Sequence, residues 1–239
     1  MPRRVLVATA LVGWALTSSA FAQTASPARG GRAGGEGPTR PPLFFSESWK
    51  ALPTPTDEHG EWPAGPAGVA SPNLQLSLYG PSGKDIMLVA VRGRADVYPL
   101  NLWTGMTTSP IGATLRDKSN YVDLVDALAK IRWVVRTSGF HQIRPLIKLA
   151  DGTWLVGDHT SGPFADFNQT DVSIADVRWM KIDTARMVTV GVWVDHPDLS
   201  RVDEVGFADL MPGSGHGAGG YVNVAKIEVF GKPIKRYIP

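Results

Sequence analysis

The side chains best suited to chemistry in this sequence are cationic, amide and aromatic groups gathered between positions 132 and 159. They are Arg132, Arg136, Gln142, Arg144, Lys148, Trp154, Asp158 and His159. Arginine forks hold carboxylates or sulfates through paired hydrogen bonds. Aromatic rings supply flat apolar surface in binding sites that also carry a few polar groups. Together these residues predict a shallow binding surface for carbohydrate, with a preference for acidic glycans.

Three β-strands between positions 131 and 158 would have to position these side chains. Apolar residues occupy alternate positions in 131–135 and recur with the same spacing in 143–149, and the two connections carry Gly139 and Gly152. Period-two alternation with glycine-bearing turns is typical of antiparallel strands that bury one face. We therefore expect three neighbouring strands in one sheet that direct the eight side chains to one outer face or its rim.

The rest of the chain repeats this strand pattern and shows no βαβ alternation and no internal repeat. Roughly eight to ten strands at regular spacing predict an all-β, antiparallel jelly-roll β-sandwich. The polar, glycine-bearing stretch 104–119 is interpreted as a loop, and 121–130 as a loop with a brief helical turn. The further expected strands are 43–45, 73–80, 85–92, 97–103, 177–181, 187–194, 205–210 and 221–230.

The N-terminal composition predicts export. Arg3 and Arg4 precede an apolar run, and Ala20-Phe21-Ala22 forms a small-residue cleavage motif before Gln23. These are the parts of a secretory signal peptide, although an uncleaved anchor is the alternative. We expect a signal peptide at 1–22, a disordered Gly/Pro/Arg linker at 23–42 and a single domain at 43–239. The predicted location is secreted or periplasmic.

Composition excludes several kinds of site. The chain has 0 cysteines, so disulfides, thiol nucleophiles and cysteine-ligated metals are absent. Lys+Arg number 24 against 22 Asp+Glu, a balance that does not point to nucleic acid. Glycine-rich 211–220 lacks the Lys-Ser/Thr and the following helix of a nucleotide-binding loop. The expected ligand is therefore neither nucleic acid nor nucleotide.

Two phrases, YVDLVDALAKIRWVVRTSGFHQIRPLIKLADG and VDEVGFADLMPGSGHGAGGYVNVAKIEVFG, resemble the galactose-binding-like jelly-roll domains. The resemblance extends over most of 44–231 and implies a carbohydrate-binding-module type of fold. It also implies a possible structural calcium ion between the first and last strands. Glu47 and Glu228 are the candidate ligands by that analogy, against the alternative of plain surface carboxylates.

Catalysis and protein interaction remain alternatives to binding. A polysaccharide lyase needs a base beside cationic groups, which His141 could supply next to Arg144. A glycoside hydrolase needs two facing carboxylates. Asp158 with Asp166 is one such pair, and Asp203 with Glu204 is another, although neighbours on a strand should point to opposite faces. No spacing specifies a reaction, so we favour a non-catalytic binding protein that requires no cofactor. An envelope protein-interaction domain is the other alternative. The tryptophans Trp103, Trp133, Trp179 and Trp193 are expected in the core.

Overall fold

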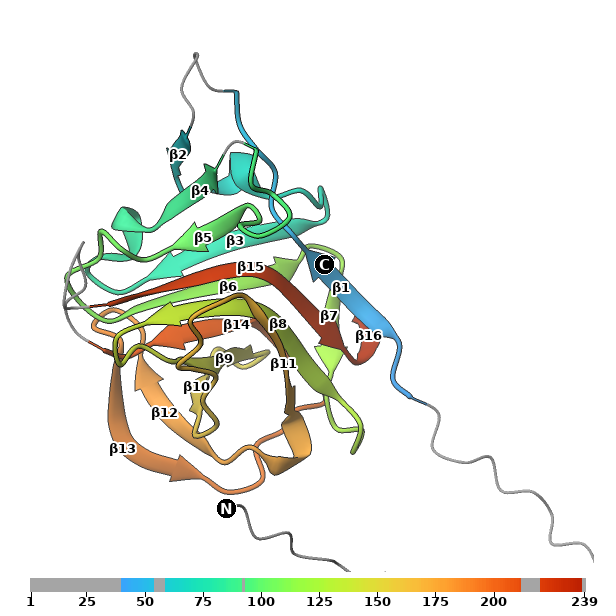
Figure 1. Cartoon of the computed structure of the whole chain (residues 1–239). Coiled ribbons are helices and arrows are strands. Elements are labelled where there is room, and N and C mark those ends of the chain that lie inside the picture. Colours follow the sequence, from blue (N-terminus) through green and yellow to red (C-terminus); the bar gives the residue numbers. More distant parts are fainter. Residues whose placement is uncertain (1–39, 54–58, 92, 212–219, 238–239) are drawn as a thin grey trace, which may run out of the picture. The chain divides into compact units, whose positions relative to one another are not determined.

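Figure 1 shows the computed structural model of the chain, which describes residues 40–53, 59–91, 93–211 and 220–237. All of these belong to the second of the two units into which the chain divides, Thr39–Pro239. The predicted signal peptide lies outside the described residues, as do the predicted linker up to residue 39 and residues 212–219 of the glycine-rich stretch. None of the helices in the described part is long and apolar enough to cross a membrane.

The described residues form strands joined by turns, loops and three single-turn 3-10 helices. The helices are η1 (Pro66–Gly68), η2 (Gly83–Asp85) and η3 (Ile174–Asp176). The strands are β1 (Leu43–Glu47), β2 (His59–Pro63), β3 (Leu74–Tyr79), β4 (Met87–Val91), β5 (Asn101–Trp103), β6 (Ile111–Asp117), β7 (Asn120–Asp123), β8 (Lys130–Ser138), β9 (Ile143–Leu149), β10 (Trp154–Gly157), β11 (Asn168–Ser173), β12 (Trp179–Asp183), β13 (Val188–Val194), β14 (Val202–Asp209), β15 (Tyr221–Phe230) and β16 (Lys232–Lys235).

The strands pair into two antiparallel sheets that pack face to face. The smaller sheet has seven strands in the order β11-β8-β15-β5-β4-β2, with β1 beside β15. The larger has nine strands in the order β13-β12-β10-β9-β14-β6-β3, with β7 beside β14 and β16 beside β7. The chain crosses repeatedly between the sheets, as Figure 1 shows. The prediction of an all-β jelly-roll sandwich is confirmed.

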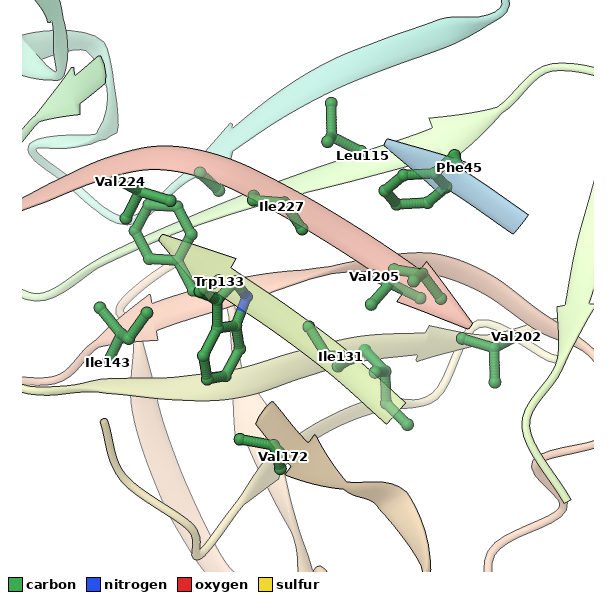
Figure 2. Packing of buried hydrophobic residues seen from close by; sticks show 14 of the residues in the cluster. Phe45, Leu115, Ile131, Trp133, Ile143, Val172, Val202, Val205, Val224 and Ile227 are labelled. Atoms are coloured by element: carbon green, nitrogen blue, oxygen red, sulfur yellow. The ribbon is translucent and has the colours of Figure 1, made fainter. Parts of the chain in front are cut away.

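The inner faces of the two sheets form the main hydrophobic core, part of which Figure 2 shows. Trp133 of β8 and Phe207 of β14 are each 0% exposed, so the two sheets contribute a large ring each to the centre. Ile131 and Val135 flank Trp133 on the same face of β8 and are equally buried. Full burial of such side chains stabilises the fold by about 1.5–3 kcal/mol each. The alternation seen in the sequence is therefore the pattern of a sheet with one inner face.

Two segments that the sequence suggested as loops are paired strands. β6 was expected to be part of a loop because its outward positions hold Gly112 and Thr114, which make the stretch read as polar. Its inward residues Ile111, Ala113 and Leu115 are all 1% exposed, and it lies between β14 and β3. β6 is buried on both faces, because its outward residues Gly112 and Thr114 are covered as well. β7 likewise takes up the first three residues of 121–130, whereas 124–129 form the loop with a brief turn that was expected.

The expectation that 131–158 forms three neighbouring strands of one sheet is wrong. β8 pairs with β11 and β15 in the smaller sheet, whereas β9 pairs with β14 and β10 in the larger one. The turn after β8 therefore leads from one sheet to the other rather than closing a hairpin. Two strands with alternating apolar residues can pack their apolar faces together equally well across a sandwich, so the pattern does not distinguish these arrangements.

Candidate functional site

The split between the sheets divides the predicted binding residues between opposite outer faces of the sandwich. Inward residues alternate with outward ones on both strands, so Arg132 and Arg136 lie on the outer face of the smaller sheet. Arg144 and Lys148 lie on the outer face of the larger sheet. The remaining predicted residues, Gln142, Trp154, Asp158 and His159, belong to or adjoin β9 and β10 of the larger sheet. The single cationic face expected from the sequence is therefore not formed.

On the smaller sheet, Arg132 is engaged by carboxylates of its neighbours. Its Nε donates to Asp171 Oδ1 over 2.6 Å and its Nη2 to Asp171 Oδ2 over 3.0 Å. Lys130 Nζ donates to the same carboxylate over 2.6 Å. The hydrogen bond from Arg132 and then that from Lys130 hold the pKa of Asp171 at about 2, against the opposing effect of partial burial. Both cations are thus committed to Asp171, which makes Arg132 a poor anion receptor.

The two calcium-ligand candidates do not come together. Glu47 faces Ile227 in the β1–β15 register and is 0% exposed, whereas Glu228 faces Ser46 and points to the other side of the sheet. The Glu47 carboxylate accepts backbone hydrogen bonds from Trp49 (2.8 Å), Ala70 (2.8 Å) and Ser71 (3.0 Å). Hydrogen-bond donors aimed at the carboxylate do not fit a cation at the same oxygens. Glu47 instead anchors Ala70 and Ser71 onto β1.

A β-bulge on β14 places two neighbouring carboxylates on the same outer face of the larger sheet. The register of β14 against β9 shifts between Val202 and Glu204. As a result Lys148 Nζ lies 3.1 Å from Glu204 Oε1 and 3.4 Å from Asp203 Oδ2. The expectation that Asp203 and Glu204 would point to opposite faces is therefore wrong. An inserted residue on one strand is the usual way in which a bulge redirects side chains.

These two carboxylates are saturated by structural partners. Glu204 Oε2 accepts hydrogen bonds from Tyr79 (2.8 Å) and Thr114 (2.6 Å). Asp203 Oδ1 accepts from Arg116 Nε over 2.9 Å and also pairs with Arg236. Trp154 packs edge-on against Tyr79 with ring centroids 4.7 Å apart. This end of the outer face is a closed network in which Lys148 and Trp154 are already bonded or packed.

A second, small hydrophobic cluster covers the middle of the outer face. Leu146 and Met187 are 0% and 1% exposed although both lie on the outer side of the sheet. The tip of the β12–β13 hairpin crosses the face to the opposite end of the sheet. There the backbone N–H of Gly80, directly after β3, donates to Thr184 O over 3.1 Å. A side chain at Gly112 would meet Leu146 and Met187 at once. The outer face is therefore interrupted between Lys148 and Arg144.

An open pocket remains at the Arg144 end of this face. It has a volume of about 300 Å³, and we name it the Arg144 pocket. Trp193 of β13 forms one wall with 42% of its surface exposed, so the expectation that this tryptophan is buried is wrong. Trp103, Trp133 and Trp179 are 7% exposed or less, as expected. The lining residues are Arg144, Val156, Gly157, Asp158, Met180, Thr189, Trp193 and Leu210.

Hydrogen bonds with neighbouring residues hold the polar groups of the Arg144 pocket in place. Arg144 Nη1 donates to the backbone oxygen of Asp158 over 3.1 Å, and no carboxylate of the described residues pairs with its guanidinium. Asp158 Oδ1 accepts from His159 Nδ1 (2.9 Å) and from the backbone N–H of Arg178 (3.0 Å). Burial opposes ionisation of Asp158, but these hydrogen bonds outweigh it and hold its pKa below the ordinary value. Arg144 thus presents an oriented cation that no carboxylate in the described part of the chain neutralises.

Trp193 is itself fixed by a cation that lies over its ring. The guanidinium carbon of Arg178 lies 4.4 Å from the centroid of the Trp193 ring, a cation–π distance. Met180 is the register partner of Trp193 on β12, so the two side chains are neighbours on the same face of the sheet. Neither Trp193 nor Met180 was predicted as a site residue. The alternation in 187–194 placed valines on one side, but it could not show that this strand is the sheet edge.

The catalytic arrangements suggested by the sequence are not assembled. His141 is 1% exposed, and its Nδ1 lies 2.6 Å from Asp209 Oδ2. It is therefore a buried partner of Asp209 rather than a base in the Arg144 pocket. Asp166 lines a different pocket on the smaller sheet, so it does not face Asp158. Across the described part of the chain, no cluster of three or more His, Asp or Glu side chains could hold a metal ion.

Comparison with known proteins returns distant structural likenesses. A family 11 carbohydrate-binding module of a Clostridium thermocellum cellulase is 13% identical, with 80% of this chain and 98% of that one covered and a TM-score of 0.35. A family two carbohydrate esterase from Cellvibrio japonicus is 12% identical over 75% of this chain and 36% of that one, with a TM-score of 0.26. Arcelin-5, a lectin-like defence protein from Phaseolus vulgaris, is 9% identical over 74% and 100%, with a TM-score of 0.28.

No protein-family model matches the sequence, and no curated protein matches it either. At TM-scores this low the structural likenesses assign neither a residue nor a ligand. The Arg144 pocket is therefore defined only by the contacts within this chain.

Proposed function

We propose that the protein is a non-catalytic carbohydrate-binding protein that holds an acidic sugar unit in the Arg144 pocket. The observation that supports this most directly is the Arg144 guanidinium, which is anchored at Nη1 and has no carboxylate partner among the described residues. Its remaining N–H groups can form the paired hydrogen bonds that a sugar carboxylate or sulfate accepts. Trp193 offers an aromatic wall beside it, with 42% of its surface exposed.

The other groups of the pocket suit the hydroxyls of the same sugar. Asp158 Oδ2 takes part in none of the hydrogen bonds formed by the described residues, so it can accept one from a hydroxyl. Met180 and Leu210 complete the apolar lining. A small cavity with apolar walls and a few fixed polar groups is the usual form of a preformed ligand site. Charge, shape and polarity therefore agree on one pyranose ring that carries an anionic substituent.

Binding is favoured over hydrolysis because the pocket lining contains one carboxylate. Glycoside hydrolases use a pair of carboxyl groups about 5–9.5 Å apart. Asp158 is the acidic residue among the described residues that line the pocket, and Asp203 and Glu204 are bonded within their own network. The pocket can orient a sugar, but its described lining residues offer no second carboxylate to act as acid, base or nucleophile.

A binding assay on the full chain tests this function. The probes are polygalacturonate, alginate and chondroitin sulfate, with neutral xyloglucan for comparison, measured by affinity electrophoresis and calorimetry. We expect an acidic polymer to bind. Added salt should weaken this binding, because the ion pair between Arg144 and the anionic group of the sugar is partly exposed. Loss of a charged hydrogen bond in Arg144→Ala should weaken binding about tenfold to hundredfold. Trp193→Ala should weaken it as well.

Matched controls keep this test specific. Arg201→Ala removes an exposed arginine away from the Arg144 pocket, and Phe140→Ala removes a ring that is 84% exposed. Both should bind as the unchanged protein does. The proposal is wrong if the acidic polymers do not bind, or if Arg144→Ala binds as tightly as Arg201→Ala. Release of shortened sugar chains from a bound polymer would instead favour an enzyme.

Export to the periplasm or beyond is part of the same proposal, and the composition of residues 1–22 supports it. Intact-mass measurement of the protein collected outside the cytoplasm should show a chain that begins at Gln23. A chain that retains Met1 and stays with the membrane fraction would favour the uncleaved anchor.

A further inference from the structure

A second pocket lies on the opposite side of the sandwich, where the loop before β5 meets the outer face of β8. It has a volume of about 480 Å³, and we name it the Phe167 pocket. It is larger than the Arg144 pocket and shares no residue with it. Its lining residues are Val91, Arg94, Val97, Tyr98, Arg136, Asp166 and Phe167.

The aromatic wall of the Phe167 pocket is built and braced. Tyr98 and Phe167 meet edge to face, with ring centroids 5.5 Å apart and an interplanar angle of 84°. The hydroxyl of Tyr98 accepts a hydrogen bond from Asn223 Nδ2 over 3.0 Å. Asn223 is 0% exposed and also donates to Asn101 over 2.9 Å. A buried amide pair therefore fixes Tyr98, which in turn supports Phe167.

Arg136 spans the aromatic residues behind this wall. Its guanidinium carbon lies 5.7 Å from the Tyr98 ring centroid and 5.9 Å from that of Tyr221. Its Nε donates to the backbone oxygen of Ala165 over 2.9 Å. The described residues provide no carboxylate partner for Arg136, so its terminal N–H groups remain available to a ligand. The sequence singled out Arg136 for ligand binding, although on a face that it does not share with Arg144.

The rim of the Phe167 pocket carries groups of both signs. Asp166 and Arg94 are both exposed. Neither side chain forms a hydrogen bond or ion pair with another residue in the described parts of the chain. Asp166 can therefore accept hydrogen bonds while Arg94 and Arg136 donate them. This differs from the Arg144 pocket, where one oxygen of Asp158 is already bonded to its neighbours.

We propose that the Phe167 pocket is a second carbohydrate site and that it binds a neutral pyranose ring. A neutral sugar offers hydroxyls that both donate to Asp166 and accept from Arg94 and Arg136. The Asp166 carboxylate, which has no partner among the described residues, opposes an anionic substituent more than Asp158 does, because His159 and the Arg178 N–H donate to Asp158. Its apolar ring face can pack on Phe167, and the braced Tyr98 keeps that wall rigid before the ligand arrives. The site goes beyond the proposed acidic-sugar function and does not depend on it, because the two pockets lie on different sheets.

Calorimetry with neutral hexasaccharides tests this site on the full chain. The probes are cellohexaose, xylohexaose and mannohexaose at low and high salt. We expect at least one of them to bind with little dependence on salt, because a neutral sugar forms no ion pair with the protein. Phe167→Ala should weaken that binding at least tenfold, and Asp166→Ala, a change at an exposed residue, should weaken it as well. Phe140→Ala is the matched control and should leave it unchanged.

Amide chemical shifts distinguish this site from the Arg144 pocket. A neutral hexasaccharide should shift amides around Asp166 and Phe167, and Arg144→Ala should not alter that response. The inference is overturned if no neutral hexasaccharide binds, or if Phe167→Ala and Asp166→Ala both bind as Phe140→Ala does. Shifts confined to the surroundings of Arg144 and Trp193 would also overturn it and leave the acidic-sugar proposal standing. If every probe, acidic or neutral, shifts only amides around the Phe167 pocket, the second site is supported and the acidic-sugar proposal is wrong.

Discussion

Tyr79 donates its phenolic hydrogen to Glu204 Oε2 over 2.8 Å and so joins β3 to β14 across the outer face of the larger sheet. Glu204 is 4% exposed, and burying a carboxylate is costly unless such donors hydrogen-bond to it. Tyr79→Phe keeps the ring against Trp154 but removes one charge-assisted hydrogen bond. We expect the free energy of unfolding to fall by about 2 kcal/mol, measured by urea denaturation at pH 7.

The same contact predicts an alkaline transition. Burial, followed by the hydrogen bond to Glu204, raises the pKa of Tyr79 from 10.0 to about 12. The folded state therefore favours the neutral phenol. The stability that Tyr79 contributes over phenylalanine is fully present below pH 10 and is lost as pH rises toward 12. The difference in the free energy of unfolding between the unchanged protein and Tyr79→Phe should therefore decrease between pH 10 and pH 12. A difference that stays constant over this range would contradict this account.

Asp171 predicts the opposite dependence at acid pH. Its pKa of about 2, set by the hydrogen bonds from Arg132 and then Lys130, is below the ordinary 3.8. The stability it contributes is present above pH 3.8 and is lost as pH falls toward 2. Asp171→Asn should cost less than about 1 kcal/mol at pH 7, because the pair is partly exposed. That cost should disappear near pH 2, which thermal melts across the range would show.

Substitutions at Trp133 and Trp193 should have different effects, the first on stability and the second on ligand binding. Trp133 is 0% exposed and packs between the sheets (Figure 2), so Trp133→Ala should lower the free energy of unfolding by about 3–5 kcal/mol. Trp193→Ala should change it by less than about 1 kcal/mol while reducing binding of an acidic glycan. Chemical denaturation of both variants measures the difference. Equal destabilisation would mean that Trp193 is part of the core after all.

Glu47 should act as a structural anchor and not as a metal ligand. Glu47→Ala removes the acceptor of three backbone N–H groups, from Trp49, Ala70 and Ser71. We expect a loss of about 3 kcal/mol, since hydrogen bonds to charged groups are the strong ones. Thermal melts with and without a calcium chelator provide the companion measurement. A chelator-induced drop in the melting temperature that vanishes in Glu47→Ala would show that this carboxylate binds calcium.

The sandwich could be predicted because the alternation at Ile131, Trp133 and Val135 is a local pattern, which can be recognised without knowing how the strands pair. This pattern could not show that β8 and β9 belong to different sheets, since pairing partners are long-range choices. The eight site residues were therefore divided, with Arg144 and Asp158 left together in one pocket and Arg136 in another. Trp193 was missed because its exposure depends on β13 being the outermost strand. Asp203 was misplaced because a bulge leaves no mark in the alternation.

β13 also bears on how the molecule behaves at high concentration. Its valines, Val188, Val190 and Val192, are 50%, 49% and 49% exposed on the last strand of the larger sheet. If such an apolar edge strand were flat, it would invite a second chain to add its own strand. Gly191 has a φ of 72°, and the strand departs from regular pairing with β12 at that point. The kink interrupts the row of free N–H and C=O groups, so the margin that supports the Arg144 pocket is also guarded against self-association.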